Sequence, residues 1–323
     1  MHRVKDYKIP YYNIRQKDLS LNKSFKNKMS HYLATKDSFH PIPGLQSTDI
    51  LGVECHSMVP QGICTCENYV LTTSYDSSND YNSAIYVLED NKLIATLIYD
   101  KKVHMGGITY DGSYIWIAEG GGSAHGNEMG AIKKDDFFNA VNKCVNSGKN
   151  SIQLTNILTC QAEGLKYTSF CSFYDNILWI GSFSISTTSH IYGYKVCFEN
   201  EQLSLKPIKY IEAPKKAQGI CFYNSQDTTF FCVSTSYGRR YNSVFRCYKL
   251  KDYNHPTETF NNIPQIMKNT AYRTLTFPPM SEQINIIDNL IYCIFESAAN
   301  KYIKNSLRPI GSYCIFNADK FFK

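Results

Sequence analysis

Glu282 and Glu296 are the two residues of this chain that best suit acid–base chemistry. If their carboxyl groups face each other across a pocket, the charge of one raises the pKa of the other, and the protonated member can donate a proton near neutral pH. A salt bridge from either glutamate to Lys301 or Arg239 is the alternative, because an opposite charge keeps a carboxyl group ionised. The chemistry depends on whether the fold brings the glutamates together.

Two further residues are candidates for chemistry. His104 could act as a general base or be a hydrogen-bonded histidine at the rim of a pocket. Glu119 precedes three glycines, Gly120 to Gly122, which would let the backbone approach a ligand closely. These glycines do not form a phosphate loop, because no Gly-Lys-Ser/Thr ending and no helix follow them. The predicted catalytic residues are Glu282, Glu296, Glu119 and His104.

A short turn-to-strand element recurs five times and would position these side chains. The copies start near residues 61, 106, 169, 218 and 282, with spacings of 45, 63, 49 and 64 residues. Such a period suits one four-stranded propeller blade for each copy, with insertions in the longer units. The sequence therefore predicts an all-β, five-bladed β-propeller with short helical insertions and an N-terminal extension.

Turns and insertions support this reading. Asp111-Gly112 and Asp175-Asn176 predict hairpin turns in the second and third units, because these residues tolerate positive φ. Lys134 to Val145 has apolar residues on one face, as in a short amphipathic helix. Residues 252 to 270, with two prolines, are a second insertion for which we also expect helical character.

The predicted domain organisation is an extension over residues 1–45 and a single propeller domain over residues 46–323. Residues 1–45 show no repeat. Ring closure requires a strand from one end of the chain to complete the blade at the other end, because an open edge invites aggregation. Ile50 to Glu54 is the predicted closing strand.

The loops that lead into the innermost strands of a propeller open on one face, so equivalent residues of the five repeats form a ring. Convergent polar groups in such a concave site are typical of ligand binding. Glutamine and serine at these positions could instead hydrogen-bond to neighbouring backbones, and the tyrosines could either stack on a ligand or cap the blades. The predicted ligand-binding residues are Gln61, Tyr75, Glu163, Ser169, Gln218, Tyr237, Arg239 and Lys301.

The composition limits the partners. The net charge of +6 is modest and the lysines are spread along the chain of 323 residues, so nucleic-acid binding is not expected. No stretch approaches the roughly 18 apolar residues of a membrane span, and no apolar run follows the N-terminus. We therefore expect a cytoplasmic protein with no membrane contact. Its oligomeric state is left open.

The twelve cysteines suggest neither disulfides nor a metal site. Most of them lie in predicted strands, where a thiol behaves as a small apolar group. Cys64 and Cys66 are separated by one residue, but no second pair of cysteines or histidines follows at the spacing of a zinc site. We expect core thiols such as Cys171 and Cys221, no metal and no cofactor.

Two family resemblances follow from these motifs. Gln218-Gly219-Ile220, Ser234 to Arg239 and Asn242-Ser243 resemble a blade of plant-type glutaminyl cyclases, five-bladed propellers that cyclise N-terminal glutamine. This resemblance implies an acidic residue in the axial pocket, for which Glu282 and Glu163 are the nearest candidates. Over residues 60–316 the chain is more similar to an uncharacterised group of bacterial propeller proteins with the same blade signatures, which implies the architecture alone. These signatures are Gln61-Gly62, His104 to Gly107, Ser169-Phe170 and Phe295 to Ser297.

The leading functional hypothesis is the binding of a small polar molecule or a peptide end in the axial pocket, with or without catalysis. A glutaminyl-cyclase-like acyltransferase or cyclase that uses an axial carboxylate is one alternative. A protein-interaction platform is another, and the 25 tyrosines permit it.

Overall fold

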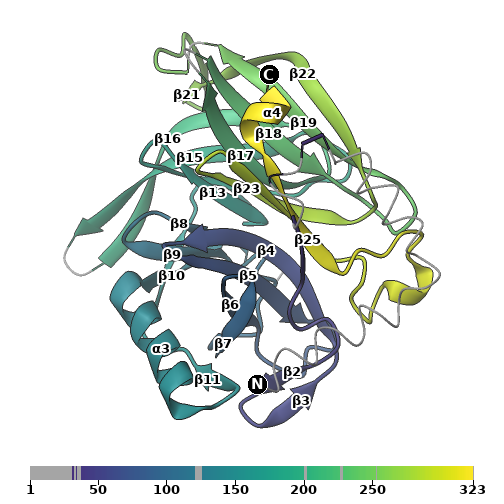
Figure 1. Ribbon diagram of the computed structural model, residues 1–323. Helices are drawn as coiled ribbons and strands as arrows, with labels where there is room; N and C mark the ends of the chain where they lie inside the picture. Colours follow the sequence, from purple (N-terminus) through teal and green to yellow (C-terminus); the bar gives the residue numbers. More distant parts are fainter. Residues whose placement is uncertain are drawn as a thin grey trace.

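The computed structural model describes residues 31–32, 34, 38–120, 126–199, 202–225, 228–251 and 253–322. Its strands form five main sheets around a common axis, so the chain is a five-bladed β-propeller, as predicted (Figure 1). The innermost strands contact one another in a closed ring, β4 to β8, β8 to β13, β13 to β17, β17 to β23, and β23 back to β4.

Blades one and two come from the first half of the chain and share an insertion. Blade one contains β4 (Met58–Cys66), β5 (Tyr69–Asp76), β6 (Ala84–Glu89), β7 (Lys92–Ile98) and, parallel to β7 at the edge, β11 (Ser151–Gln153). Blade two contains β8 (Gly107–Tyr110), β9 (Tyr114–Ala118), β10 (Glu128–Lys133) and β12 (Ile157–Gln161). The predicted helix is confirmed as α3 (Lys134–Ser147), which packs outside these blades through its buried residues Phe137, Val141 and Cys144.

Blades three and four carry the second insertion. Blade three contains β13 (Phe170–Tyr174), β14 (Ile177–Gly181), β15 (Ser189–Glu199), β16 (Gln202–Ala213), β21 (Ile263–Gln265) and β20 (Glu258–Phe260). Blade four contains β17 (Ala217–Ser225), β18 (Thr228–Thr235), β19 (Ser243–Lys251) and β22 (Met267–Phe277).

The expected helical character of residues 252–270 is wrong, because their described part forms the hairpin of β20 and β21. Asn261 and Asn262 both have positive φ, which makes the tight turn. Pro264 has no backbone N–H, which disfavours a helix interior, and the pairing of β21 with β16 is limited to Gln265. The hairpin extends blade three at its outer edge.

Blade five joins the two ends of the described chain. It contains β23 (Ser281–Ile287), β24 (Leu290–Phe295), β25 (Ser312–Asn317) and β1 (Phe39–Pro41). A 3-10 turn (η1, Ile303–Asn305) lies between β24 and β25, and the short helix α4 (Ala318–Phe322) follows β25.

The predicted closing strand, Ile50 to Glu54, is wrong. Residues 48–55 form a separate hairpin of β2 (Thr48–Ile50) and β3 (Val53–Cys55), because Leu51 and Gly52 have positive φ and turn the chain back on itself. Strand β1 closes the ring by pairing antiparallel with β25. The expected N-terminal extension therefore supplies the outer strand of blade five, and its first 30 residues lie outside the described residues.

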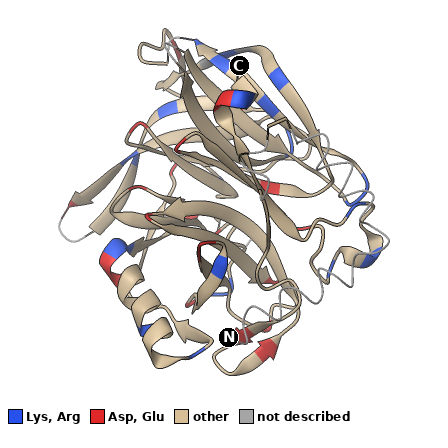
Figure 2. Cartoon of the chain, viewed as in Figure 1, with Lys and Arg blue, Asp and Glu red and all other residues tan. Residues whose placement is uncertain are grey.

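Apolar side chains fill the spaces between neighbouring blades. Leu71 and Ile85 of blade one, for example, belong to the same buried cluster as Ile115 and Ile117 of blade two. Charged residues lie mainly outside these contacts, and acidic and basic segments are interspersed over the ribbon (Figure 2). None of the described helices is long and apolar enough to span a membrane.

At the axis, the fully buried side chain of Gln283 links three other blades to blade five. Its Oε1 accepts hydrogen bonds from the backbone N–H groups of Ile63 (3.0 Å) and Ile108 (2.9 Å). Its Nε2 donates to the carbonyl oxygens of Ile108 (2.7 Å) and Cys171 (3.0 Å). Burial of these backbone N–H and C=O groups without hydrogen-bond partners would cost free energy, and the single amide side chain of Gln283 supplies the partners.

The innermost strands come this close because glycine stands at the contacts. A Cβ atom on Gly107 would lie 2.6 Å from the backbone nitrogen of Cys171, and a Cβ on Gly219 would lie 2.6 Å from the Cα of Gln283. Both contacts are far below van der Waals distance. Glycines in the predicted start motifs are therefore needed for close backbone approach.

We expect Gln283→Ala to lower the free energy of unfolding by about 3 kcal/mol or more, because it leaves buried N–H and C=O groups of three blades without partners. Urea unfolding followed by circular dichroism measures the change. Gln161→Ala, at an exposed position of β12, is the matched control and should change the stability by less than about 0.5 kcal/mol. Equal stability of the two variants would contradict the role assigned to Gln283.

Candidate functional site

A cavity of about 590 Å³ is lined by residues of all five blades, among them Glu282, the neighbour of the axial Gln283. It brings together most of the residues that the sequence singled out. These are Gln61, Tyr75, His104, Ser169, Gln218, Tyr237, Arg239, Glu282 and Glu296.

Bulges in the innermost strands direct these side chains into the cavity. The pairing of β4 with β5 skips Gln61, the pairing of β17 with β18 skips Gln218, and the pairing of β23 with β24 skips Glu282 and Gln283. A bulge leaves residues out of the ladder and changes the direction of their side chains. Adjacent residues of β23 can thus serve different purposes, with Gln283 at the axis and Glu282 in the cavity.

Glu282 and Glu296 form a hydrogen-bonded pair of carboxyl groups at the inner end of the cavity. Glu282 is 2% exposed, and Glu296 keeps some exposure where it lines the cavity. Burial, followed by the charge of Glu296, raises the pKa of Glu282 well above its usual range. Burial raises the pKa of Glu296 to about 7, although hydrogen bonds and nearby positive charges offset part of the effect. The pair therefore retains a proton near neutral pH.

Two glutamine side chains hold the acid pair in place. The Nε2 of Gln218 donates to Oε1 of Glu282 over 3.2 Å, and the Nε2 of Gln61 donates to Oε2 of Glu296 over 3.2 Å. Gln61 also donates to the carbonyl oxygen of Pro60 over 2.9 Å, which fixes its orientation. The amides thus present their hydrogens to the acids.

His104 lies against Tyr75 on one wall. The two rings are stacked with their centroids 4.6 Å apart and an angle of 24° between their planes. Burial, followed by the positive charge of Lys301, lowers the pKa of His104 to about 4. His104 is therefore neutral at pH 7, when it can exchange hydrogen bonds but is a weak base.

Positive charges lie near two tyrosines of the cavity, Tyr75 and Tyr302. Lys301 donates from Nζ to the hydroxyl of Tyr75 over 3.1 Å, and that hydroxyl is 3.5 Å from the hydroxyl of Tyr302. The guanidinium carbon of Arg239 is 5.0 Å from the ring centroid of Tyr302. Burial raises the pKa of Tyr302 to about 12 and that of Tyr75 further, so both hydroxyls keep their protons. Among the ion pairs of the described residues, none involves Glu282 or Glu296.

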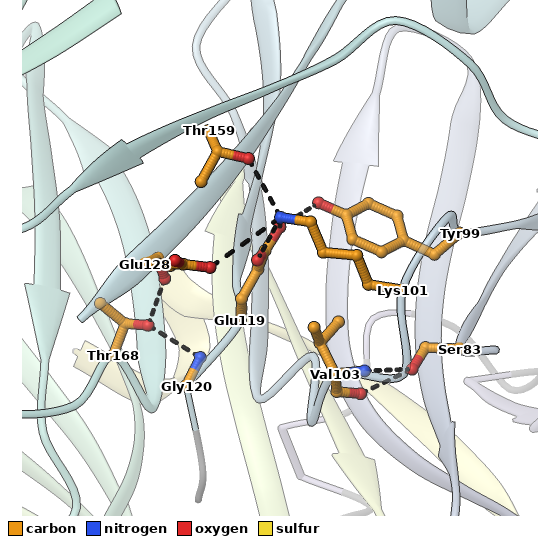
Figure 3. A network of polar contacts seen from close by, with 9 residues as sticks. All are labelled: Ser83, Tyr99, Lys101, Val103, Glu119, Gly120, Glu128, Thr159 and Thr168. Carbon is orange, nitrogen blue, oxygen red and sulfur yellow. Dashed lines mark hydrogen bonds and ion pairs between the residues drawn. The ribbon is translucent and has the colours of Figure 1, made fainter. Parts of the chain in front are cut away.

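The structure places Glu119 outside this cavity, in a network at the edge of blade two (Figure 3). Its carboxylate accepts hydrogen bonds from the hydroxyl of Tyr99 (2.5 Å) and from Nζ of Lys101 (2.9 Å). Lys101 also donates to the hydroxyl of Thr159 over 3.0 Å. Because Glu119 is buried and its carboxylate is bonded to Tyr99 and Lys101, which follow the last antiparallel strand of blade one, the geometry fits a structural tie between blades one and two.

Glu163 and Lys301 also stand apart from the cavity lining. Glu163 is exposed, and its backbone carbonyl accepts a hydrogen bond from the hydroxyl of Tyr194 over 2.6 Å. Lys301 is exposed and contacts two residues of the cavity wall, the hydroxyl of Tyr75 over 3.1 Å and the ring of Tyr302 at 5.2 Å from its centroid.

Sequence reasoning missed several apolar and aromatic residues of the walls. Phe183 stacks on Tyr237 with ring centroids 6.5 Å apart. The position of Phe183 directly after the second strand of its blade was a usable signal, because the other blades contribute Tyr75 and Tyr237 near the same point. The lining residues outside the prediction are Tyr167, Phe183, Ser236, Gly238, Met280 and Tyr302.

The thiols near the strand starts lie in the core. Cys64, Cys171 and Cys221 are buried, and burial raises the pKa of each well above the usual range. Such thiols are poor nucleophiles. Within the described ranges, no three His, Cys, Asp or Glu side chains are grouped as a metal site requires.

Comparisons with known proteins give little beyond the fold. No family model and no curated protein sequence matches the chain. Among solved structures, the chain is similar to a GH32 beta-fructofuranosidase from Bombyx mori, a mutant in complex with sucrose, with a TM-score of 0.40 and 10% sequence identity. The match covers 86% of this chain and 61% of that one, so the chain spans less than two thirds of that enzyme's length. The two family resemblances remain predictions.

The acid pair should make stability fall as pH rises. Because the folded pKa values lie above the unfolded value of about 4.3, the folded protein binds more protons than the unfolded chain from about pH 4 to beyond pH 7. The double variant Glu282→Gln/Glu296→Gln has side chains of similar shape that do not ionise, so it does not lose stability in this way as pH rises. We expect its stability relative to the unmodified protein to increase by about 3 kcal/mol between pH 4 and pH 8.

Urea unfolding of both proteins across this pH range measures the difference between their free energies of unfolding. The contributions of all other titrating groups cancel in this difference. A difference that stays constant with pH, or one that reverses sign, would show that the ionised pair is already neutralised in the fold.

Proposed function

We propose that the axial cavity binds a small polar molecule or a peptide end, and that Glu282 and Glu296 anchor it. The observation that carries this proposal is the acid pair itself, two carboxyl groups that line the cavity and that, among the described residues, form no ion pair with a lysine or arginine. Perturbed carboxyl groups in a concave site are candidates for function.

A purely structural role explains the pair poorly. Burial of ionisable groups costs free energy, and apolar residues of similar size would hold the blade together at least as well. Gln61 and Gln218 orient the two carboxyl groups but do not neutralise them. A bound ligand would supply the missing partner.

The walls suit a ligand of modest size. A cavity of about 590 Å³ lies within the range of small-molecule sites, about 300–1,000 Å³. Tyr75, Phe183 and Tyr237 provide flat surfaces for contact, while Arg239 and the hydroxyl of Tyr302 add hydrogen-bond donors. The arrangement combines apolar contact with a few placed polar groups.

Ligand-observed NMR with defined mixtures of amino acids, dipeptides, monosaccharides and disaccharides tests this proposal. We expect at least one compound to bind, and Glu282→Ala to weaken its binding about tenfold or more because a charged hydrogen bond is lost. Glu258→Gln, on the exposed hairpin of blade three, is the control and should bind normally. Failure of every mixture, or equal binding by Glu282→Ala, would contradict the proposal.

Catalysis by the same pair is the second candidate, because Glu282 holds a proton beside a carboxyl group whose pKa is about 7. In a glutaminyl-cyclase-like reaction, the N-terminal amine of a peptide attacks its own glutamine side-chain amide carbon and ammonia leaves. A protonated carboxyl group could give its proton to the departing nitrogen, and the partner carboxylate could accept one from the attacking amine.

Release of ammonia from the peptide Gln-Ala-Ala measures this reaction. We expect a rate above that of the peptide alone, with an ionisation near pH 7 that disappears in Glu296→Gln, and a loss of about 100-fold in Glu282→Gln. Glu258→Gln again serves as the control. A rate no higher than that of the peptide alone would restrict the cavity to binding.

A further inference from the structure

The hydrogen-bonding groups at the inner end of the axial cavity are mainly acceptors. The carboxyl oxygens of Glu282 and Glu296 face it, and the amide hydrogens of Gln61 and Gln218 already point at these acids. The amide oxygens of both glutamines are further acceptors. A group with several donors, such as an ammonium, therefore fits the inner end best.

The tyrosines of the cavity wall have the opposite character, because each of the four carries a cationic side chain over its ring, although among these cations only Arg239 itself lines the cavity. The cation lies 5.0 to 5.4 Å from the ring centroid in every case, within the usual range of a cation–π contact. The pairs are Lys301 with Tyr75, Lys166 with Tyr167, Lys216 with Tyr237, and Arg239 with Tyr302.

These four cations, which we call the cationic mouth, are more exposed than the acid pair. Lys166 and Lys301 are exposed and Lys216 and Arg239 are half-buried, whereas Glu282 is buried. Among the ion pairs of the described part of the chain, none involves these four side chains. Arg239 can contact an anionic group that enters the cavity, and the three lysines, which lie against its tyrosines, add positive charge around it.

Building on the proposed function, we propose that the ligand is a short zwitterion, a free amino acid or an unblocked dipeptide. Its ammonium group lies at Glu282 and Glu296, and its carboxylate lies at the cationic mouth. The polarity of the cavity sets this orientation, and the reverse would place like charges together at both ends. The volume of about 590 Å³ accommodates a dipeptide with its side chains against the aromatic walls.

Binding of an ammonium group should release a proton from the acid pair. The charged or titratable groups that face the pair are His104, Tyr75, Tyr302, Arg239, Lys301 and the buried thiol of Cys293. Of these, His104, the tyrosines and the thiol of Cys293 are neutral at pH 7, because burial lowers the pKa of His104 and raises the pKa of the others. A proton released at pH 7 therefore comes from the two glutamates.

Four forms of one dipeptide test the inference by titration calorimetry at pH 7: Ala-Ala, N-acetyl-Ala-Ala, Ala-Ala amide and N-acetyl-Ala-Ala amide. We expect Ala-Ala to bind most tightly. Acetylation should weaken binding about tenfold or more, and amidation about threefold to tenfold, because each removes one charged contact. In the double variant Arg239→Met/Lys301→Met, the affinities of Ala-Ala and Ala-Ala amide should differ less than in the unmodified protein, because two of the cations that attract the carboxylate are gone.

Titrations of Ala-Ala in two buffers with different heats of ionisation count the protons exchanged. We expect a net release of up to about one proton at pH 7 in the unmodified protein, and none in Glu282→Gln/Glu296→Gln. Because these glutamine replacements are expected to stabilise the fold at this pH, loss of the signal would not reflect unfolding. Glu258→Gln should release the same number of protons as the unmodified protein.

The outcomes separate this inference from the proposed function. If the fully blocked dipeptide binds as tightly as Ala-Ala, and Glu282→Ala weakens both, the cavity is the binding site but the zwitterion is overturned. If none of the four forms binds at millimolar concentration, while a sugar binds and Glu282→Ala weakens its binding, the cavity is again the binding site and the zwitterion is again overturned. If Ala-Ala binds equally to the unmodified protein and to the double glutamine variant, both proposals fail.

Discussion

The hydrogen bonds of Gln283 are the interaction on which the rest of the structure depends. Five innermost strands meet at the axis, and their geometry leaves backbone groups of Ile63, Ile108 and Cys171 without ladder partners. One planar amide with two hydrogens and two lone pairs satisfies these groups together, which no apolar side chain could do. The blades can therefore approach closely at the axis, where Gln283 is fully buried.

Stability and the candidate site are joined through one bulge. The pairing of β23 with β24 leaves out both Glu282 and Gln283. These consecutive side chains therefore point in different directions, Glu282 toward the cavity and Gln283 into the axis. A change that straightened β23 would restore two ladder positions but would remove both side chains from their places. The bulge in β23 thus positions both the acid pair and Gln283, which links the blades at the axis.

The sequence predicted the blade number and most of the cavity, because period and turn chemistry are local properties. Gln61, Gln218 and Glu282 stood at equivalent places in the repeat, and the ring brought them together. The role of Gln283 was not visible, since it depends on bonds to residues more than 100 positions away. Glu119 also occupied a plausible place in its repeat, but the nearby Lys101 and Tyr99 draw its carboxylate to the blade edge. Likewise, the hairpin turn at Leu51 and Gly52 took residues 50–54 away from ring closure, which β1 performs.

The closure of blade five by β1 has a consequence for the order of events during synthesis. Domains acquire structure from the N-terminus as the chain emerges, but here β1 must wait for β25, nearly the whole length of the chain later. Blade five also brings Gln283, Glu282 and Glu296, so the axis of the first four blades stays unsatisfied until β23 and β24 have been synthesised. The ring and the acid pair are therefore completed together in one late step, and a truncated chain would have neither.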